Sequence, residues 1–248
     1  MKILLGLVGQ YRTFEKTYEN IFENLIDNNE EHEFDIIANT DFNNMNVNAT
    51  NKKGVKVKDY SVEELIPKLK ACYGKRLIKI MNYENKITNI SGSMLFRKRI
   101  ENILENLKTK YDLYIFLRFD VAFENPVSIC DFKENSFNVI CGSIEYKNRQ
   151  DHNRDWDFCF VFDKPLFFYH FLGRYADDDI PYTKNVDPYK LKEMLVNSNV
   201  DSSYIDKYIN DKQCVMKWVE NFWILLYNIS VHGCCVNFET NNFLTLVR

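Results

Sequence analysis

A basic and an acidic residue stand directly after an apolar run that has the composition of a buried β-strand. The run is Leu113–Leu117, and Arg118, Phe119 and Asp120 follow it. A carboxylate at the end of a buried strand costs free energy unless it is paired with a cation. Asp120 could hold a hard divalent cation together with a diphosphate. Alternatively, Arg118 could pair with Asp120 or with a phosphate, so the sequence predicts charged partners at this strand end.

A second polar stretch, GQYR at positions 9–12, follows the apolar run Lys2–Val8. A helix is expected immediately afterwards, with Thr13 as its N-cap. Gly9 lets the backbone approach a ligand, a helix N-terminus favours an anion, and Arg12 could bind a phosphate through two N–H groups. The stretch matches neither G-x-G-x-x-G nor a P-loop, which weakens the dehydrogenase and P-loop kinase interpretations. An ordinary turn with a surface arginine is the alternative.

The composition is that of a globular protein with one sizeable core. The chain has 248 residues, of which 46% are hydrophobic and 15% aromatic, and a net charge of −3. This charge gives no general attraction to nucleic acid or to anionic membranes, so neither is expected as a partner. No apolar run reaches the roughly 18 residues of a membrane span. The seven cysteines form no C-x-x-C pair, and a cytoplasmic protein with reduced thiols is expected.

Apolar runs that alternate with helical periodicity predict an α/β protein with a mostly parallel open sheet flanked by helices. Strands are expected at Lys2–Val8, Phe34–Ala38, Val55–Tyr60, Leu113–Leu117, Phe137–Cys141 and Phe158–Phe162, and edge strands at Val231–Phe238 and Phe243–Val247. Helices are expected over Phe14–Asp27, from Ser61 with a capping box, over Ser91–Lys110, from Pro165 and over Gln213–Ile229, while Lys79–Ile90 is ambiguous. Ligands of such sheets bind off the carboxyl ends of the strands, which is where residues 9–12, 39–41 and 118–120 fall.

Several of these motifs occur in a fixed order along residues 1–175. An apolar strand is followed by Gly-Gln-x-Arg-Thr-Phe, and a second strand ends in Asn-Thr-Asp at 39–41. Asn-Ile-Ser at 89–91 opens a helix before a strand that starts with Tyr-Asp and ends in Arg-Phe-Asp, and an Asp-Trp-Asp-Phe segment comes later. This order resembles the short GT-A-fold glycosyltransferases that build capsule, lipopolysaccharide and, in large DNA viruses, virion glycans.

The resemblance implies one GT-A-like catalytic domain over residues 1–248. Residues 1–125 would form the half that binds the nucleotide sugar. Residues 126–248 would form the acceptor-binding half, with a polar insertion at 177–211. The donor would be a sugar on a nucleoside diphosphate, with UDP as the first expectation and GDP as the second. The acceptor would be a sugar on a growing glycan.

The resemblance also implies roles for the strand-end residues. Gly9, Gln10 and Arg12 would line the nucleotide, and Asn39 and Thr40 would lie near its base or ribose.

Arg118-Phe119-Asp120 takes the place of the family's Asp-x-Asp motif. Asp120 would hold Mn²⁺ or Mg²⁺ against the diphosphate, and the metal would act as a Lewis acid on the leaving group. Because Arg118 replaces the first aspartate of the motif, the metal dependence is left open, and Arg118 could itself neutralise the diphosphate.

An inverting transfer needs a carboxylate that deprotonates the acceptor hydroxyl. Asp155-Trp156-Asp157 combines two carboxylates with an aromatic ring on which a sugar can pack, and Asp157 is the first candidate base with Asp155 second. Glu220, within an apolar helical pattern, is the third, and a glutamate paired at the helix rim is its alternative. Because the residues offer a base and no evident second nucleophile, inversion is expected.

Two further groups of residues, a late histidine and a basic cluster, each allow a functional and a structural interpretation. His232 matches a late metal ligand of some GT-A enzymes, or it is structural. Arg97, Lys98 and Arg99 could add positive charge near the diphosphate, although a solvated helix face is expected. Two other functions are compatible with such a sheet, namely a nucleotidyltransferase or sugar-phosphate enzyme and a non-catalytic module that binds nucleotide sugars or glycans.

Overall fold

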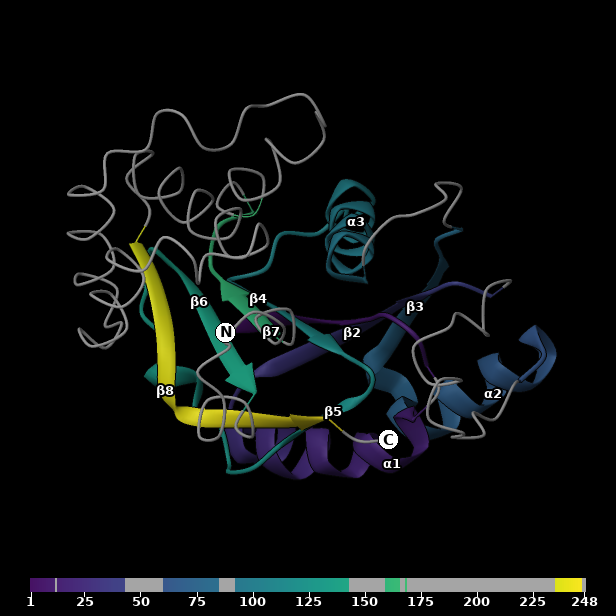
Figure 1. The fold of residues 1–248 in the computed structure, drawn as a ribbon, viewed down its shortest axis with the longest axis horizontal. Helices are drawn as coiled ribbons and strands as arrows, with labels where there is room; N and C mark the ends of the chain where they lie inside the picture. The colour runs from purple at the N-terminus through teal and green to yellow at the C-terminus, as the bar shows by residue number, and fades with distance from the viewer. Residues whose placement is uncertain are drawn as a thin grey trace, which may run out of the picture.

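The computed structural model of the chain describes residues 1–11, 13–42, 60–84, 92–142, 159–165, 168 and 235–246. These residues build an open sheet of eight strands in the order β3-β2-β1-β4-β7-β6-β8-β5, with helices on both faces (Figure 1). The expected α/β class with an open sheet is therefore confirmed.

One half of the sheet is entirely parallel. It contains β1 (Lys2–Val8), β2 (Glu33–Thr40), β3 (Leu77–Asn82) and β4 (Leu113–Arg118). Central β1 pairs with both β2 and β4, and β2 pairs with β3. Since the central strands are covered on both faces, their sequences are continuous apolar runs, which is why β1, β2 and β4 were predictable.

The other half is mixed. It contains β5 (Val121–Phe123), β6 (Ser136–Gly142), β7 (Cys159–Phe162) and β8 (Cys235–Leu246). Strand β7 runs antiparallel to β4 and β6, while β8 runs parallel to β6 and antiparallel to β5. The parallel pairings of the first half, together with β6–β8, make the sheet mostly parallel, as expected.

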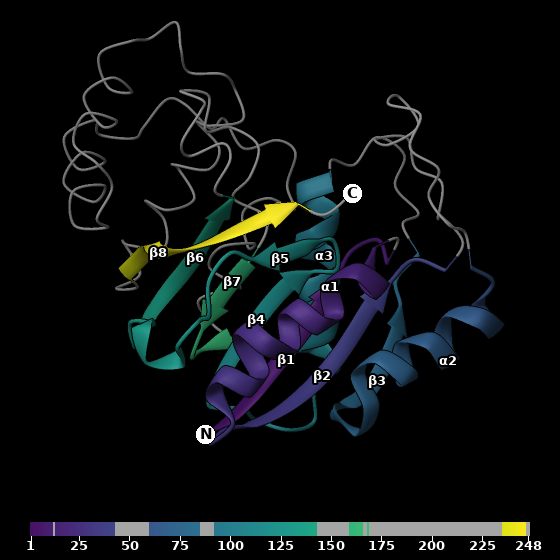
Figure 2. The ribbon, with the colours of Figure 1, turned by 90° about the horizontal axis from the view of Figure 1, so that it is seen from below.

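Three helices of the described part of the chain flank the parallel half. Helix α1 (Phe14–Ile21) continues through a π-helical turn, Phe22–Ile26, and a 3₁₀ turn, Asp27–Asn29. Helix α2 spans Val62–Tyr73 and α3 spans Gly92–Glu105. Short 3₁₀ turns at Gly74–Arg76 and Ile129–Asp131 complete the described elements. Figure 2 shows α1 and α2 on the near face of the sheet and α3 behind it.

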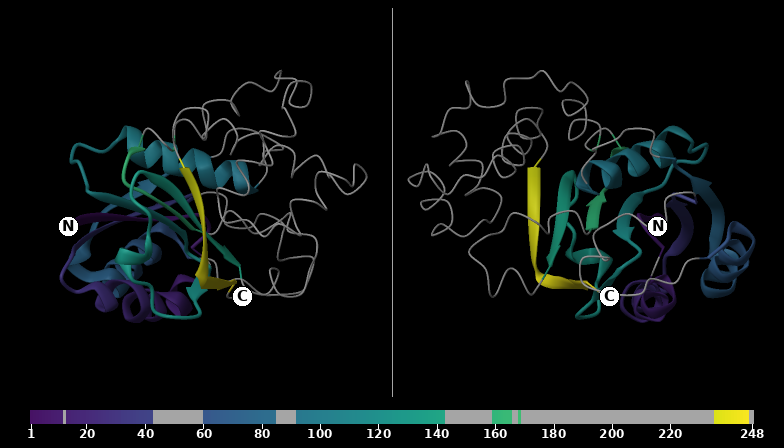
Figure 3. Two further views of the ribbon diagram at one scale, coloured as in Figure 1. Left: turned by 90° about the vertical axis from the view of Figure 1, so that its left-hand side faces the viewer. Right: turned by 45° about the vertical axis from the view of Figure 1, so that its right-hand side comes forward.

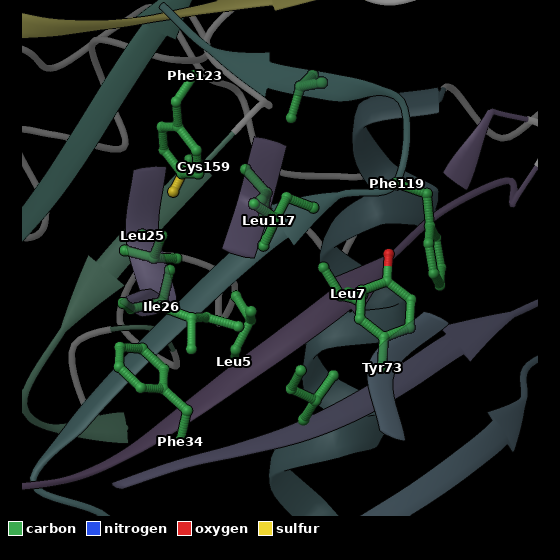
Figure 4. Packing of buried hydrophobic residues seen from close by; sticks show 14 of the residues in the cluster. Leu5, Leu7, Leu25, Ile26, Phe34, Tyr73, Leu117, Phe119, Phe123 and Cys159 are labelled. Atoms are coloured by element: carbon green, nitrogen blue, oxygen red, sulfur yellow. The ribbon is translucent and has the colours of Figure 1, made fainter. Parts of the chain in front are cut away.

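The sheet separates two apolar layers. Ile3, Leu5 and Leu7 of β1 belong to the layer under α1 and α2, and Figure 4 shows Leu5 and Leu7 within it. The opposite layer is aromatic over β4, β6 and β7. There Phe162 stacks on the rings of Phe116 and Phe137, with centroid distances of 5.6 and 5.5 Å. Strand alternation thus gives each face of β1 and β4 its own core.

Several expected boundaries need correction. The helix expected over Ser91–Lys110 ends at Glu105, and the first residues of the ambiguous segment Lys79–Ile90 belong to strand β3, which begins earlier, at Leu77. The two expected edge strands near the chain end are one strand, β8, which lies between β6 and β5 and bends beside β5 (Figures 1 and 3). The helix expected at Gln213–Ile229 lies outside the described residues, and so does the strand expected at Val55–Tyr60 except for Tyr60, which is not in a strand.

The capping signals of α1 and α2 have different outcomes. The Ser61 capping box is confirmed, because Ser61 Oγ accepts from the Glu64 N–H while Glu64 Oε2 accepts from the Ser61 N–H. Thr13 precedes α1 as expected, but its hydroxyl makes no capping hydrogen bond. Within the described residues, no helix combines the length and the apolarity needed to cross a bilayer.

Candidate functional site

The path of the chain defines a switch point between β1 and β4. The connections β1-α1-β2 and β2-α2-β3 add strands on one side of β1, and α3 then leads the chain over the opposite face to β4 on the other side (Figure 2). The strand order therefore reverses between β1 and β4. In open α/β sheets, ligands bind outside the carboxyl ends of the strands at such a point.

Three strand ends meet at this edge in register. Val8 of β1 pairs with Asn39 of β2 on one side and with Arg118 of β4 on the other. The sequence-predicted positions 39 and 118 are therefore brought together across β1, as the parallel arrangement required.

Gly9 begins the turn that leaves β1. Its N–H donates to the carbonyl oxygen of Asn39 over 3.1 Å, and its φ is +119°. Residues with a Cβ rarely adopt this conformation. A Cβ built on Gly9 would have no heavy atom of the described residues within 4 Å. Glycine is thus required here by the backbone conformation, and the space beside it leaves room for a ligand.

The buried residue Tyr11 anchors the turn after Gly9. The Tyr11 hydroxyl donates to the carbonyl oxygen of Tyr60 over 3.3 Å, and the two rings are 6.0 Å apart. The Tyr60 hydroxyl in turn donates to Glu15 Oε2 of α1, and Lys68 of α2 pairs with Glu15 Oε1 at 2.7 Å. This chain of contacts connects the turn to α1 and α2.

Arg118 and Asp120 form a bidentate ion pair. Arg118 Nε donates to Asp120 Oδ1 and Nη2 donates to Oδ2, each over 2.8 Å. The Asp120 side chain is 5% exposed and that of Arg118 is 26% exposed. The guanidinium therefore compensates a buried carboxylate and still reaches the surface. Of the partners predicted for Asp120, the structure shows the arginine.

Contacts on the face of the sheet that α1 and α2 cover hold the turn with this ion pair in place. Phe119, between the two charged residues, is fully buried in the α1 and α2 layer (Figure 4). Its carbonyl oxygen accepts from Thr17 Oγ1 of α1 over 2.7 Å. The apolar residue of the Arg-Phe-Asp motif thus acts as an anchor that holds the charged residues at the edge.

The residues at this strand end do not fit a divalent cation. Asp120 already uses both carboxylate oxygens for Arg118. Among the described residues, no group of three or more histidine, cysteine, aspartate or glutamate side chains could hold a metal ion. Mg²⁺ and Mn²⁺ prefer oxygen donors, and a guanidinium bound to the one carboxylate supplies none.

Asn39 and Thr40 lie on neighbouring positions of β2 and are buried. Asn39 Nδ2 donates to the Arg99 carbonyl oxygen over 2.9 Å and to Asn102 Oδ1 over 3.1 Å, which ties α3 to the end of β2. The Oδ1 atom of Asn39 and the hydroxyl of Thr40 have no hydrogen-bond partner in the part of the chain that the structure describes. Contact of these residues with a base or ribose stays a prediction.

The expectation of a solvated basic face on α3 is wrong for two of its three residues. Arg97 is 5% exposed and Arg99 is 3% exposed, while Lys98 pairs with Glu101 at 2.8 Å. Burial lowers the pKa of Arg99 to about 10, and the negative charge of Asp41 opposes that shift. A buried guanidinium beside the end of β2 is a candidate anion contact that sequence reasoning undervalued.

Five predicted site residues lie outside the described part of the chain. They are Arg12, Asp155, Asp157, Glu220 and His232. Cys159, two residues after Asp157 in the sequence, is described, and it pairs with Leu117 beside the Arg118 strand end. The roles of these five residues stay predictions.

Comparisons with known proteins give a structural likeness only. No protein-family model matches the chain, and no curated protein sequence matches it. Two solved structures of LgtC are similar over 96% of this chain. An active-site mutant has 11% identity over 72% of its own chain, and the galactosyltransferase with donor and acceptor sugar analogues has 10% over 73%, each with a TM-score of 0.38. Neither match assigns the chain to a family.

Proposed function

We propose that this chain is a glycosyltransferase that moves a sugar from a nucleoside-diphosphate donor to a hydroxyl of a glycan acceptor. UDP is the first expected nucleotide and GDP the second. The observation that carries the proposal is the pairing of a glycine turn with an arginine–aspartate ion pair at the β1/β4 switch point. Open space beside a backbone and a partly exposed guanidinium suit a diphosphate. The Gly-Gln-x-Arg-Thr-Phe and Arg-Phe-Asp motifs add the resemblance to GT-A enzymes.

The reaction needs a base on the acceptor side, and we assign Asp157 to that role. Its carboxylate takes the proton of the acceptor hydroxyl as that oxygen attacks the anomeric carbon. The bond between the anomeric carbon and the diphosphate oxygen breaks from the opposite face, so the configuration inverts. The nucleoside diphosphate leaves with the electron pair, and the guanidinium of Arg118 offsets its negative charge.

Calorimetric titration tests donor binding. The purified chain is titrated with UDP, GDP, dTDP and CMP, each in Mn²⁺ and in EDTA. The proposal expects one nucleoside diphosphate to bind more tightly than the others, with UDP first. If none of them binds in either buffer, the proposed function is wrong.

Substitution of the base tests the chemical step. Asp157→Asn is expected to leave nucleotide binding unchanged and to lower sugar transfer by roughly 10²- to 10⁴-fold, the range of general base catalysis. Asp131→Asn, at an exposed position in the 3₁₀ turn after β5, is the matched control with unchanged transfer. Full activity of Asp157→Asn would move the base to Asp155 or Glu220.

A non-catalytic module that binds nucleotide sugars is the second candidate. The observation that favours it is Arg118 at the first position of the Asp-x-Asp motif, where it occupies the remaining carboxylate. This module would bind the nucleotide sugar but would not cleave the bond between the sugar and the nucleotide. Incubation of the protein with the UDP- or GDP-sugar, followed by measurement of released nucleotide, separates the two functions.

A further inference from the structure

The side chains at the end of β4 do not fit the divalent cation that the resemblance to GT-A enzymes implies. We infer that the guanidinium of Arg118, oriented by Asp120, takes the charge role of that cation, so that nucleotide binding needs no divalent metal. This inference rests on the proposed function, since it concerns how the same site holds the donor diphosphate.

The geometry of the pair supports this role. Asp120 accepts two hydrogen bonds from one edge of the guanidinium, through Nε and Nη2. A planar guanidinium that is held along one edge keeps a fixed orientation, and its remaining N–H groups lie outside the contact with Asp120. The Arg118 side chain is 26% exposed, whereas Asp120 is 5% exposed. Asp120 is therefore a positioning residue, and Arg118 is the residue that reaches the ligand.

The position of Arg118 places this charge at the switch point. Arg118 is the last residue of β4 and stands in register with Val8, one residue before the Gly9 turn. A diphosphate beside the open face of Gly9 would therefore lie next to the guanidinium.

A divalent cation at Asp120 would require a different arrangement. Each Asp120 oxygen already accepts a hydrogen bond from Arg118, so the cation would have to share the carboxylate with the guanidinium or displace it, and in either case two positive charges would lie side by side. Two cations at one carboxylate repel each other, and the guanidinium cannot lose its proton near neutral pH. The arginine therefore disfavours the metal both by its hydrogen bonds to the carboxylate and by its charge.

The wild-type chain gives the first test, with UDP and GDP as probes. The Kd of the nucleotide that binds is expected to agree within about twofold between EDTA and Mn²⁺, since no step of binding uses the metal. Binding that requires Mn²⁺ would overturn this inference and leave the proposed function intact. Absence of binding in both buffers would overturn the proposed function and the inference with it.

Two substitutions of Arg118 give the second test, with melting temperatures measured for each. Arg118→Gln is expected to raise the Kd in EDTA roughly 10- to 100-fold, the size of a lost charge-assisted hydrogen bond. Arg118→Asp recreates an Asp-x-Asp motif and is expected to bind nucleotide only with Mn²⁺. Lys110→Gln removes an exposed positive charge before the other end of β4 and serves as the control with an unchanged Kd. Unchanged binding in EDTA by folded Arg118→Gln would overturn the inference.

Discussion

At the scale of single residues, the end of β4 buries the carboxylate of Asp120 and offsets the cost of that burial with the guanidinium of Arg118. A buried carboxylate is unstable without a partner, and Asp120 obtains one from a residue two positions earlier in the chain. Such a pair adds little net stability, because both charges lose water. Its value lies in orientation, since it fixes one edge of the Arg118 guanidinium at the sheet edge where we propose that the nucleotide binds.

Loss of the Asp120 charge should destabilise the fold moderately. Asp120→Asn keeps the shape but turns one acceptor into an N–H₂ group that faces the Arg118 donors, and it is expected to lower the free energy of unfolding by about 1–3 kcal/mol. Arg118 is partly exposed, so water can relieve some of the cost. Urea unfolding measures the difference. Asp131→Asn, at an exposed position, should change stability by less than about 0.5 kcal/mol, and an equally stable Asp120→Asn would contradict the pairing.

The sequence allowed the charged partner of Asp120 to be predicted but not its identity. The run Leu113–Leu117 followed by Arg118 and Asp120 indicates a buried strand with a charged end. Whether Asp120 pairs with Arg118 or with a metal cation depends on a side-chain conformation, which the sequence does not show. The burial of Arg99 was missed for a related reason. Helical periodicity places it beside the apolar Ile100, and only the packing of α3 on β1 and β2 decides whether that flank is covered.

At the scale of elements, strands that are covered on both faces of the sheet were easier to predict from the sequence than strands with an exposed face. Strands β1, β2 and β4 are buried on both faces and were evident as apolar runs. Strand β3 stands at the sheet edge with several exposed residues, so its sequence LIKIMN carries no clear period. The antiparallel direction of β7 has no local signal at all, because strand direction is set by the path of the chain.

The contact between β1 and β4 leaves no room for a side chain at Gly6. A Cβ at this position would lie 2.4 Å from Cδ1 of Phe116, its partner in register. Gly6→Ala is therefore expected to lower the free energy of unfolding by about 1–3 kcal/mol through overpacking.

A double-mutant cycle tests the cause. Phe116→Leu removes the ring that meets the new Cβ, so Gly6→Ala should cost less in the Phe116→Leu background than in the wild type. Equal costs in both backgrounds would show that the strain lies elsewhere. Chemical denaturation of the four proteins supplies all the free energies of unfolding.

The connection between α1 and α2 should respond to alkaline pH. Burial, and next the hydrogen bond to Glu15, raise the pKa of Tyr60 to about 12 from its ordinary value of 10. The resulting stabilisation is complete below pH 10. Between pH 10 and 12 the unfolded chain loses this proton while the folded chain keeps it, so the free energy of unfolding falls as the pH rises.

Tyr60→Phe removes the titrating hydroxyl and tests this assignment. The decline of the melting temperature between pH 9 and 11.5 should be shallower in Tyr60→Phe than in the wild type. A Tyr60→Phe variant that follows the wild-type curve would remove Tyr60 from the alkaline transition.

At the scale of the whole molecule, strand β8, near the end of the sequence, supports the candidate site at Arg118 and Asp120, near the middle of the sequence. Strand β8 pairs with β6 through its first part and with β5 through its last (Figures 1 and 3). Strand β5 begins at Val121, directly after Asp120, so β8 holds the far side of the turn that carries the ion pair. The sequence indicated strands near the chain end, but their insertion between β6 and β5 is a long-range pairing that no local pattern encodes.

This arrangement predicts that damage to β8 weakens the whole sheet. Leu244 is 1% exposed and stands opposite Phe123 of β5. Leu244→Ala is expected to lower the free energy of unfolding by about 2–5 kcal/mol, the range for truncation of a buried leucine. Ile78→Ala on β3 is the matched control, because Ile78 is 51% exposed and its truncation should cost less than about 0.5 kcal/mol. Urea unfolding of Leu244→Ala, followed by circular dichroism, should give one transition with a lowered midpoint. Two separate transitions would contradict the expectation that β8 unfolds together with the rest of the sheet.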